Sequence, residues 1–230
     1  MDYLPKGRLD AFADGVFAIV ITLLVLDLAV PEGSTDIISG LIQEWPVFLA
    51  YLISFAFIGG VWISHSSVTH LMKRETTHSY RLTLLMLFFV SLLPFTTKLM
   101  AMYLGHPPPV PAAIFGLDLL AAWQVVNAIM RAAISTQVTI YGLNLLAATL
   151  ALVAIIRSAI ITPEIHADVS AENELNALLK KEQLGAVIIG CTLVLGVFFP
   201  LIAVTGFIVV SILFFITPTI STAKATIRKR

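Results

Sequence analysis

The sequence predicts an all-α, polytopic membrane protein with about six transmembrane helices, forming one domain over residues 1–230. Of the 230 residues, 58% are hydrophobic and 12% are charged, and the mean hydropathy is +0.95. Soluble domains, by comparison, are about one quarter charged. Apolar stretches of about 20 residues alternate with short charged clusters, and in a bilayer such stretches form helices because a helix satisfies its own backbone hydrogen bonds.

Composition and motifs also exclude several classes of function. The formal net charge is zero, so no basic field favours nucleic acid as a partner. The sequence contains no His-Glu-x-x-His, Gly-x-Ser-x-Gly or Walker A motif and no Cys/His cluster with metal spacing, which argues against an enzyme and predicts no cofactor. The single cysteine, Cys191, lies in an apolar segment and is interpreted as a packing residue.

The first apolar segment, residues 8–31, is too polar for a plain anchor and is expected to be helical over about 12–30. It begins with one arginine and two aspartates and carries a threonine in its middle. On a helix, one face carries residues at spacings of four, three and four, namely Gly15, Ile19, Thr22 and Leu26. Such a stripe also occurs in ordinary helix packing, but the polar residues make this face a candidate pore lining.

Two further spans follow. Residues 45–67 are rich in aromatic and small residues and close with Trp62-Ile-Ser-His65. Residues 82–104 contain Pro94, which is expected to kink the helix, and Thr96 or Thr97 can satisfy the carbonyls that the kink frees.

Basic residues place the N-terminus and the second loop in the cytoplasm, because short cytoplasmic loops are enriched in lysine and arginine. These residues are Lys6, Arg8, Lys73, Arg74 and Arg81. The acidic first loop is then outside. Asp27, at the outer end of the first helix, either concentrates cations at a pore mouth or is a solvated helix end, and both interpretations stay open.

The second half holds two apolar stretches, 112–134 and 138–161, followed by a longer one at 184–220. Residues 112–134 carry four polar or charged side chains and are interpreted as an interfacial or partly inserted helix, which leaves 138–161 as the fourth span. Residues 163–183 are expected to be a polar cytoplasmic linker with a short helix capped at Ser170. Two short helices then follow, the second starting at Pro200. Six spans, rather than seven, place the basic tail at 224–230 inside.

Three motifs resemble the transmembrane protein 175 family, which comprises potassium channels of bacteria, archaea and lysosomes. Arg8, Phe12 and Asp14 stand as in its Arg-x-x-x-Phe-Ser-Asp signature, with Ala13 in place of the usual serine. The other two motifs are Trp62-Ile-Ser-His65 and Leu93-Pro-Phe-Thr-Thr97. The resemblance covers about residues 8–100 and identifies the chain as a prokaryotic member.

The resemblance implies a homotetramer whose first helices line a central pore. Ile19 would form a narrow hydrophobic ring, Thr22 a polar ring and Leu26 a second apolar ring. A hydrophobic constriction can gate by dewetting, and hydroxyls can replace part of an ion's hydration shell. K⁺ is expected near Thr22 without a tight binding site.

Arg8, Asp14 and His65 fall near the cytoplasmic membrane boundary, where ionisable groups are costly unless they are paired. They are interpreted as a polar network that holds the first helix to the second. Arg8 at a helix end is also compatible with snorkelling to the interface, whereas Asp14 is too short for that.

The function expected from these features is passive conduction of K⁺ and other monovalent cations across a prokaryotic plasma membrane, with both termini cytoplasmic. The partners are the permeant ion, the lipid bilayer and further copies of the chain. The alternative is a proton-coupled secondary transporter that uses Asp14 and His65 as a relay, and a third possibility is a non-conducting scaffold.

Overall fold

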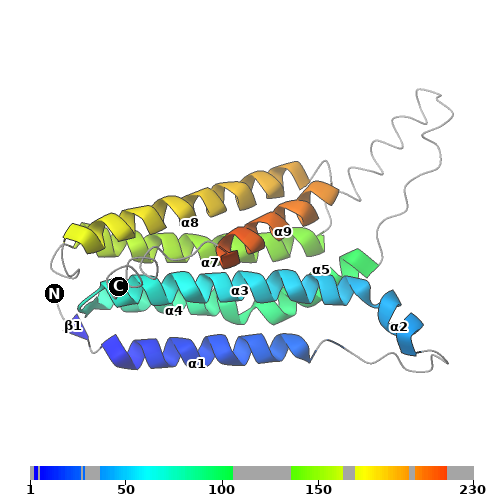
Figure 1. Cartoon of the computed structure of the whole chain (residues 1–230), viewed down its shortest axis with the longest axis horizontal. Helices are drawn as coiled ribbons and strands as arrows, with labels where there is room; N and C mark the ends of the chain where they lie inside the picture. The colour runs from blue at the N-terminus through cyan, green and yellow to red at the C-terminus, as the bar shows by residue number, and fades with distance from the viewer. Residues whose placement is uncertain are drawn as a thin grey trace, which may run out of the picture.

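Long helices that run side by side make up most of the computed structural model (Figure 1). The structure describes residues 3–4, 6–26, 28, 37–105, 136–162, 169–196 and 200–216. The helices are α1 (Lys6–Val25), α2 (Ile37–Gln43), α3 (Trp45–Leu71), α4 (Thr77–Ser91), α5 (Leu93–Gly105), α7 (Thr136–Ile161), α8 (Val169–Gly196) and α9 (Pro200–Ile216). A two-stranded antiparallel ladder joins β1 (Tyr3–Leu4) to β2 (Glu75–Thr76).

Prolines and a threonine cap set several helix boundaries. Thr76 Oγ1 accepts a hydrogen bond of 3.1 Å from the Ser79 backbone N–H at the start of α4. The helix in which a kink at Pro94 was predicted is interrupted just before that proline, because α4 ends at Ser91 and α5 begins at Leu93. The Thr96 hydroxyl donates to the Leu93 carbonyl at 3.2 Å.

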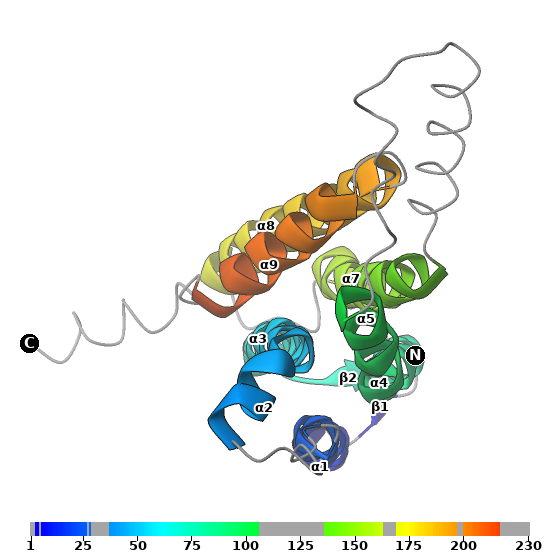
Figure 2. The same ribbon diagram turned by 90° about the vertical axis from the view of Figure 1, so that its right-hand side faces the viewer.

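The helices form layers around α3 (Figure 2). Helix α1 lies at one edge of the bundle and packs against α3, α4 and α5, while α7 packs against α4, α5 and α8. Helix α9 packs against α3 and α8. Consequently α1 has neighbours on one side only within the described part of the chain.

Buried hydroxyls tie the middle layer together. Thr97 on α5 donates to Ser54 on α3 at 2.7 Å, and the Ser54 and Tyr141 hydroxyls are 3.0 Å apart. Asn144 on α7 donates to the Thr96 hydroxyl at 3.3 Å. Polar side chains between apolar helices hydrogen-bond to one another because neither water nor lipid satisfies them there.

Three helical stretches within the described ranges are long and apolar enough to cross a membrane: Trp45–Leu71, Thr77–Gly105 (α4 and α5 together) and Thr136–Ile161. They coincide with the predicted second, third and fourth spans. Helix α1, by contrast, carries Arg8, Asp10 and Asp14 in its first half. The fold is therefore mostly helical, as predicted, with a set of apolar helices suited to a membrane.

Helix α8 corrects one expectation. Residues 169–183 are not a separate short helix capped at Ser170, because α8 runs without interruption from Val169 to Gly196. The physical reason is a buried stripe at helical spacing that crosses the polar and apolar halves, formed by Leu175, Leu178, Glu182, Gly185 and Ile189. The start of α9 at Pro200 is confirmed. The predictions for 112–134, Asp27 and the basic tail lie outside the described residues.

Candidate functional site

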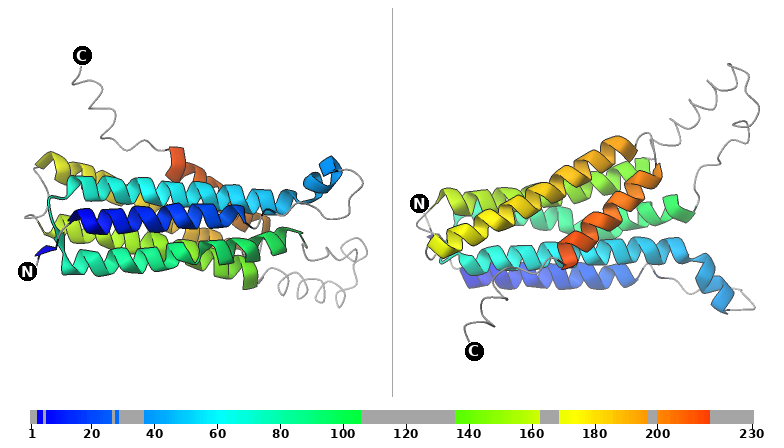
Figure 3. Two further views of the ribbon diagram at one scale, coloured as in Figure 1. Left: turned by 90° about the horizontal axis from the view of Figure 1, so that it is seen from below. Right: turned by 45° about the horizontal axis from the view of Figure 1, so that its top comes forward.

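Helix α1 crosses the near side of the bundle in the left view of Figure 3, and its side chains form two distinct faces. One is buried against its neighbours and consists of Leu9, Ala13, Phe17, Val20 and Leu24. The opposite face is exposed and includes all three predicted pore-lining residues: Ile19 is 60% exposed, Leu26 is 77% exposed, and Thr22 is exposed between them. Gly15, on the same face, has open space where a Cβ would stand.

The Thr22 hydroxyl is oriented by its own helix. It donates a hydrogen bond of 2.8 Å to the Ile19 carbonyl. Because a hydroxyl has one proton and two lone pairs, the oxygen keeps acceptor capacity when its proton is directed at the backbone. The exposed face of α1 thus presents an oxygen ligand between two bulky apolar side chains.

Asp14 connects α1 to α3. The Trp62 indole Nε1 donates a hydrogen bond of 2.8 Å to Asp14 Oδ1. Indole N–H is only a donor and a carboxylate only an acceptor, so the pair is complementary. Trp62 belongs to the Trp-x-x-His motif, but its role as the partner of Asp14 was not predicted.

His65 lies one helical turn beyond Trp62 and is 2% exposed. Its ring centroid is 6.2 Å from that of Phe17 on α1, and its Nε2 has no hydrogen-bond partner among the described residues. The structure therefore brings Asp14 and His65 to the same part of the α1–α3 interface.

The other signature residues behave differently. Arg8 is exposed and makes no hydrogen bond or ion pair with the described residues, and Phe12 is 55% exposed. Ala13 is 1% exposed, so a serine there would place its hydroxyl in the buried face of α1. A methyl group fills this position without requiring a polar partner.

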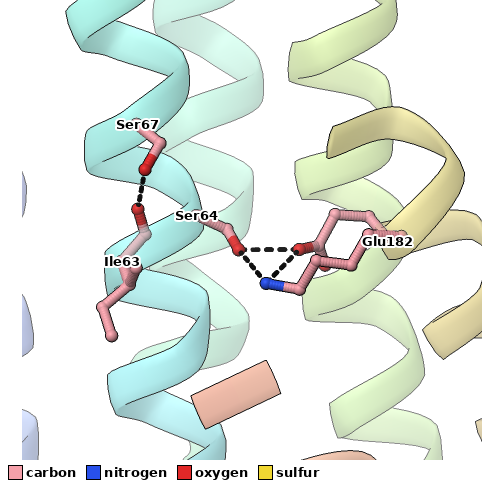
Figure 4. A network of polar contacts seen from close by, with 5 residues as sticks. Ile63, Ser64, Ser67 and Glu182 are labelled. Atoms are coloured by element: carbon pink, nitrogen blue, oxygen red, sulfur yellow. Dashed lines mark hydrogen bonds and ion pairs between the residues drawn. The ribbon is translucent and has the colours of Figure 1, made fainter. Parts of the chain in front are cut away.

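A second polar cluster joins α3 to α8 (Figure 4). The Ser64 hydroxyl donates to Glu182 Oε1 at 2.7 Å, and Lys181 Nζ donates to Ser64 Oγ at 3.3 Å. Lys181 Nζ and Glu182 Oε1 are 3.7 Å apart. The Glu182 side chain is fully buried, and its Oε2 has no partner within the described ranges.

Sequence reasoning missed this cluster because it assigned Lys181 and Glu182 to a solvated linker. The spacing from Leu175 through Glu182 to Ile189 is the signal that could have placed Glu182 on the buried face. None of the described residues forms a group of three or more His, Cys, Asp or Glu able to hold a metal ion.

The part of the chain that contains the Asp14–Trp62 contact is similar to a known protein family. The family model described as "Endosomal/lysosomal potassium channel TMEM175" matches residues 8–94. Residues 8–94 are therefore similar to the TMEM175 family. The TMEM175 region holds α1, α3, α4 and the α4–α5 break, and so it contains the exposed face of α1 and the Asp14–Trp62 contact.

Individual proteins named as potassium channels are also similar to this chain. A potassium channel of Chamaesiphon minutus is 39% identical over 132 residues, covering 55% of this chain and 65% of that relative. A potassium channel of Streptomyces collinus is 40% identical over 120 residues, covering 50% of this chain and 58% of that relative. The chain thus spans less than two thirds of the length of either relative. A crystal structure described as a lysosomal potassium-selective channel TMEM175 homolog from Chamaesiphon minutus has a TM-score of 0.69 and 28% identity, covering 91% of this chain and 95% of that chain.

Proposed function

We propose that four copies of this chain form a passive, potassium-preferring cation channel in a prokaryotic plasma membrane, with the first helix of each copy lining a central pore. It is an ion channel rather than an enzyme, and it uses no cofactor. The similarity of residues 8–94 to the TMEM175 family and the two relatives named as potassium channels support this proposal.

The observation that carries the proposal is the exposed face of α1. Lipid tails tolerate exposed isoleucine and leucine, but the same side of the helix also exposes the Asp14 carboxylate and the Thr22 hydroxyl. Polar and ionisable groups within a membrane face a bundle interior or a water-filled path rather than lipid. This face is therefore directed towards an aqueous axis shared by several copies.

The roles along that face follow from side-chain chemistry. Ile19 forms a hydrophobic constriction that opens and closes by hydration and dewetting, and Leu26 forms a second apolar ring. Thr22 supplies hydroxyl oxygens between the two, and K⁺ passes near it without a tight site. Asp14, held by Trp62, together with His65 and Arg8 keeps α1 in register on α3.

The proposed subunit is a single transmembrane domain with six spans and both termini in the cytoplasm. Helices α1, α3, α4 with α5, α7, α8 and α9 supply the spans. The polar first half of α8 extends to the cytoplasmic side, where residues 163–183 were predicted. The positive-inside distribution of Lys6, Arg74 and Arg81 supports this orientation.

Potassium-loaded proteoliposomes test the function. A channel gives K⁺ efflux down the K⁺ gradient alone. A protonophore does not abolish this efflux, because the protons that it carries only compensate the charge of the K⁺ that leaves. Efflux that requires a proton gradient would identify the proton-coupled transporter using Asp14 and His65, and no efflux from correctly assembled protein would identify a scaffold. Either result overturns the proposal. Crosslinking of the reconstituted protein tests the tetramer separately.

A further inference from the structure

A cavity of about 600 Å³ lies between the start of α4 and the end of α7. Its size falls within the range of small-molecule sites, about 300–1,000 Å³. Both helices pack closely along their length, so the walls are fixed by the bundle. The lining residues include Thr76, Thr77, His78 and Arg81 from the start of α4, and Arg157 and Ile161 from the end of α7.

The ionisable residues that line the cavity are basic. Arg81 from α4 and Arg157 from α7 bring two guanidinium groups to it, His78 adds an imidazole, and none of the lining residues within the described ranges is acidic. Neither arginine forms an ion pair with the described residues. Guanidinium groups bind phosphate through paired N–H donors, and two of them on separate helices can hold one anion from two sides.

The end of α4 adds donors to the same cavity. Thr76 and Thr77 stand at the N-terminus of this 15-residue helix, where the first N–H groups and the helix dipole favour negative charge. Thr76 Oγ1 already accepts from the Ser79 N–H at 3.1 Å. Its proton is therefore available to donate to a bound oxygen.

Glu75 is the nearest acidic residue in sequence, but it does not line the cavity. It is 1% exposed, and the groups that act on its charge are Ser79, Asp10 and Lys6. Its carboxyl group thus belongs to the side of the bundle where β1 and α1 lie, outside the described lining of the cavity.

The residues around the cavity suit a position near the membrane surface. The cavity lies at the end of the bundle that carries the basic loop between α3 and α4, and one of its lining residues, Ile161, is 78% exposed. An exposed apolar side chain beside a cationic cavity suits an amphiphile whose phosphate enters the cavity while its chains follow the helix surface.

We propose that this cavity binds a phosphate-bearing anion, held between Arg81 and Arg157 and capped by the N-terminus of α4. The phosphate comes either from the headgroup of an anionic lipid or from a soluble phosphate, and both sources present the same oxygens. The site is distinct from the α1 face and does not depend on conduction through it.

Binding of water-soluble dihexanoyl phosphatidylglycerol and of inorganic phosphate to the detergent-solubilised full chain tests the proposal. Saturable binding of either probe is expected, weakened about tenfold by Arg81→Gln or Arg157→Gln, since each removes charge-assisted hydrogen bonds. Arg81→Lys keeps the positive charge but not the paired N–H donors of the guanidinium group, so an intermediate loss of affinity is expected. Tighter binding of the lipid probe assigns the site to a headgroup, and equal or tighter binding of inorganic phosphate assigns it to a soluble anion.

Lys180→Gln is the matched control, because Lys180 is an exposed cation on α8 outside the cavity. Its affinity for both probes should equal that of the unaltered protein. Equal losses of affinity for Lys180→Gln and the arginine variants would mean that the probes bind through general surface charge, and this would overturn the proposal. The absence of saturable binding would overturn it as well. Unchanged thermal unfolding of each variant without ligand establishes that it is folded.

Discussion

The Trp62 indole donates a 2.8 Å hydrogen bond to the Asp14 carboxylate, and this contact joins the first helix to the third across 48 residues of sequence. It is the direct polar link between the signature of α1 and the aromatic motif of α3. The contact fixes the rotation of α1 and therefore the direction in which its exposed face points.

Trp62→Phe is expected to lower the stability of the folded protein by about 1 kcal/mol, because a partly exposed hydrogen bond to a charged group is lost while the ring is kept. Thermal unfolding in detergent measures this. Asp14→Asn added to Trp62→Phe should cost little more, since the two residues share the interaction. Trp45→Phe, at an exposed tryptophan on the same helix, is the control and should leave the unfolding temperature unchanged.

Ile19→Asn is expected to raise single-channel conductance several-fold and to weaken K⁺ over Na⁺ selectivity, because a polar ring stays hydrated where an isoleucine ring dewets. Planar-bilayer recording measures both quantities. Val16→Asn is the comparison, since Val16 packs against the core. It should act on assembly and yield rather than on selectivity, and equal effects on conductance at the two positions would contradict the assignment of the pore face.

Gly60→Ala is expected to destabilise the protein by about 1–3 kcal/mol through overpacking. A Cβ at Gly60 would lie 2.5 Å from Phe214 Cβ and 2.8 Å from its backbone carbon, so α3 and α9 would have to separate. Gly190→Ala meets nothing within 4 Å and should stabilise α8 by about 0.5–1 kcal/mol. Opposite shifts of the unfolding temperature are the expected outcome.

Lys181→Met is expected to cost about 3 kcal/mol, because it leaves the buried Glu182 carboxylate without its counter-charge. Adding Glu182→Gln should restore stability, since a neutral amide oxygen still accepts from Ser64. The double variant must unfold at a higher temperature than Lys181→Met alone, and the reverse order would show that the ion pair is not what matters. Lys180→Met, at the exposed neighbour, should change stability by less than about 0.5 kcal/mol.

Burial raises the pKa of the Glu75 carboxyl above its ordinary value of 4.5, the charge of Asp10 raises it further, and Ser79 and Lys6 oppose the shift. The folded state therefore binds more protons than the unfolded state just above pH 4.5, so stability falls as pH rises through this window. Glu75→Gln should remove this fall. Thermal unfolding from pH 4 to 8 measures it, and Glu172→Gln, at an exposed carboxyl on α8, should keep the pH profile.

The spans were predictable because hydrophobicity and charge clustering act locally along the chain. Trp45–Leu71, the broken helix through Pro94 and Thr136–Ile161 all follow from runs of apolar residues and from proline geometry. The exposed face of α1 was also predictable, since its spacing is a property of the helix itself. The polar first half of α8 was assigned to a linker because of its charged residues, although the helical spacing of Leu175, Glu182 and Ile189 is present in the sequence.

By itself, the sequence determined an all-helical membrane protein, its candidate spans and the residues that share the face of α1 with Ile19, Thr22 and Leu26. Only the tertiary structure decided which groups lie together: Trp62 with Asp14, Ser64 and Lys181 with Glu182, and Arg81 and Arg157 in the lining of one cavity. The physical reason is that helix formation and membrane insertion depend on composition within about 20 residues. Pairing depends on the rotation and depth at which distant helices pack, and no local pattern specifies either.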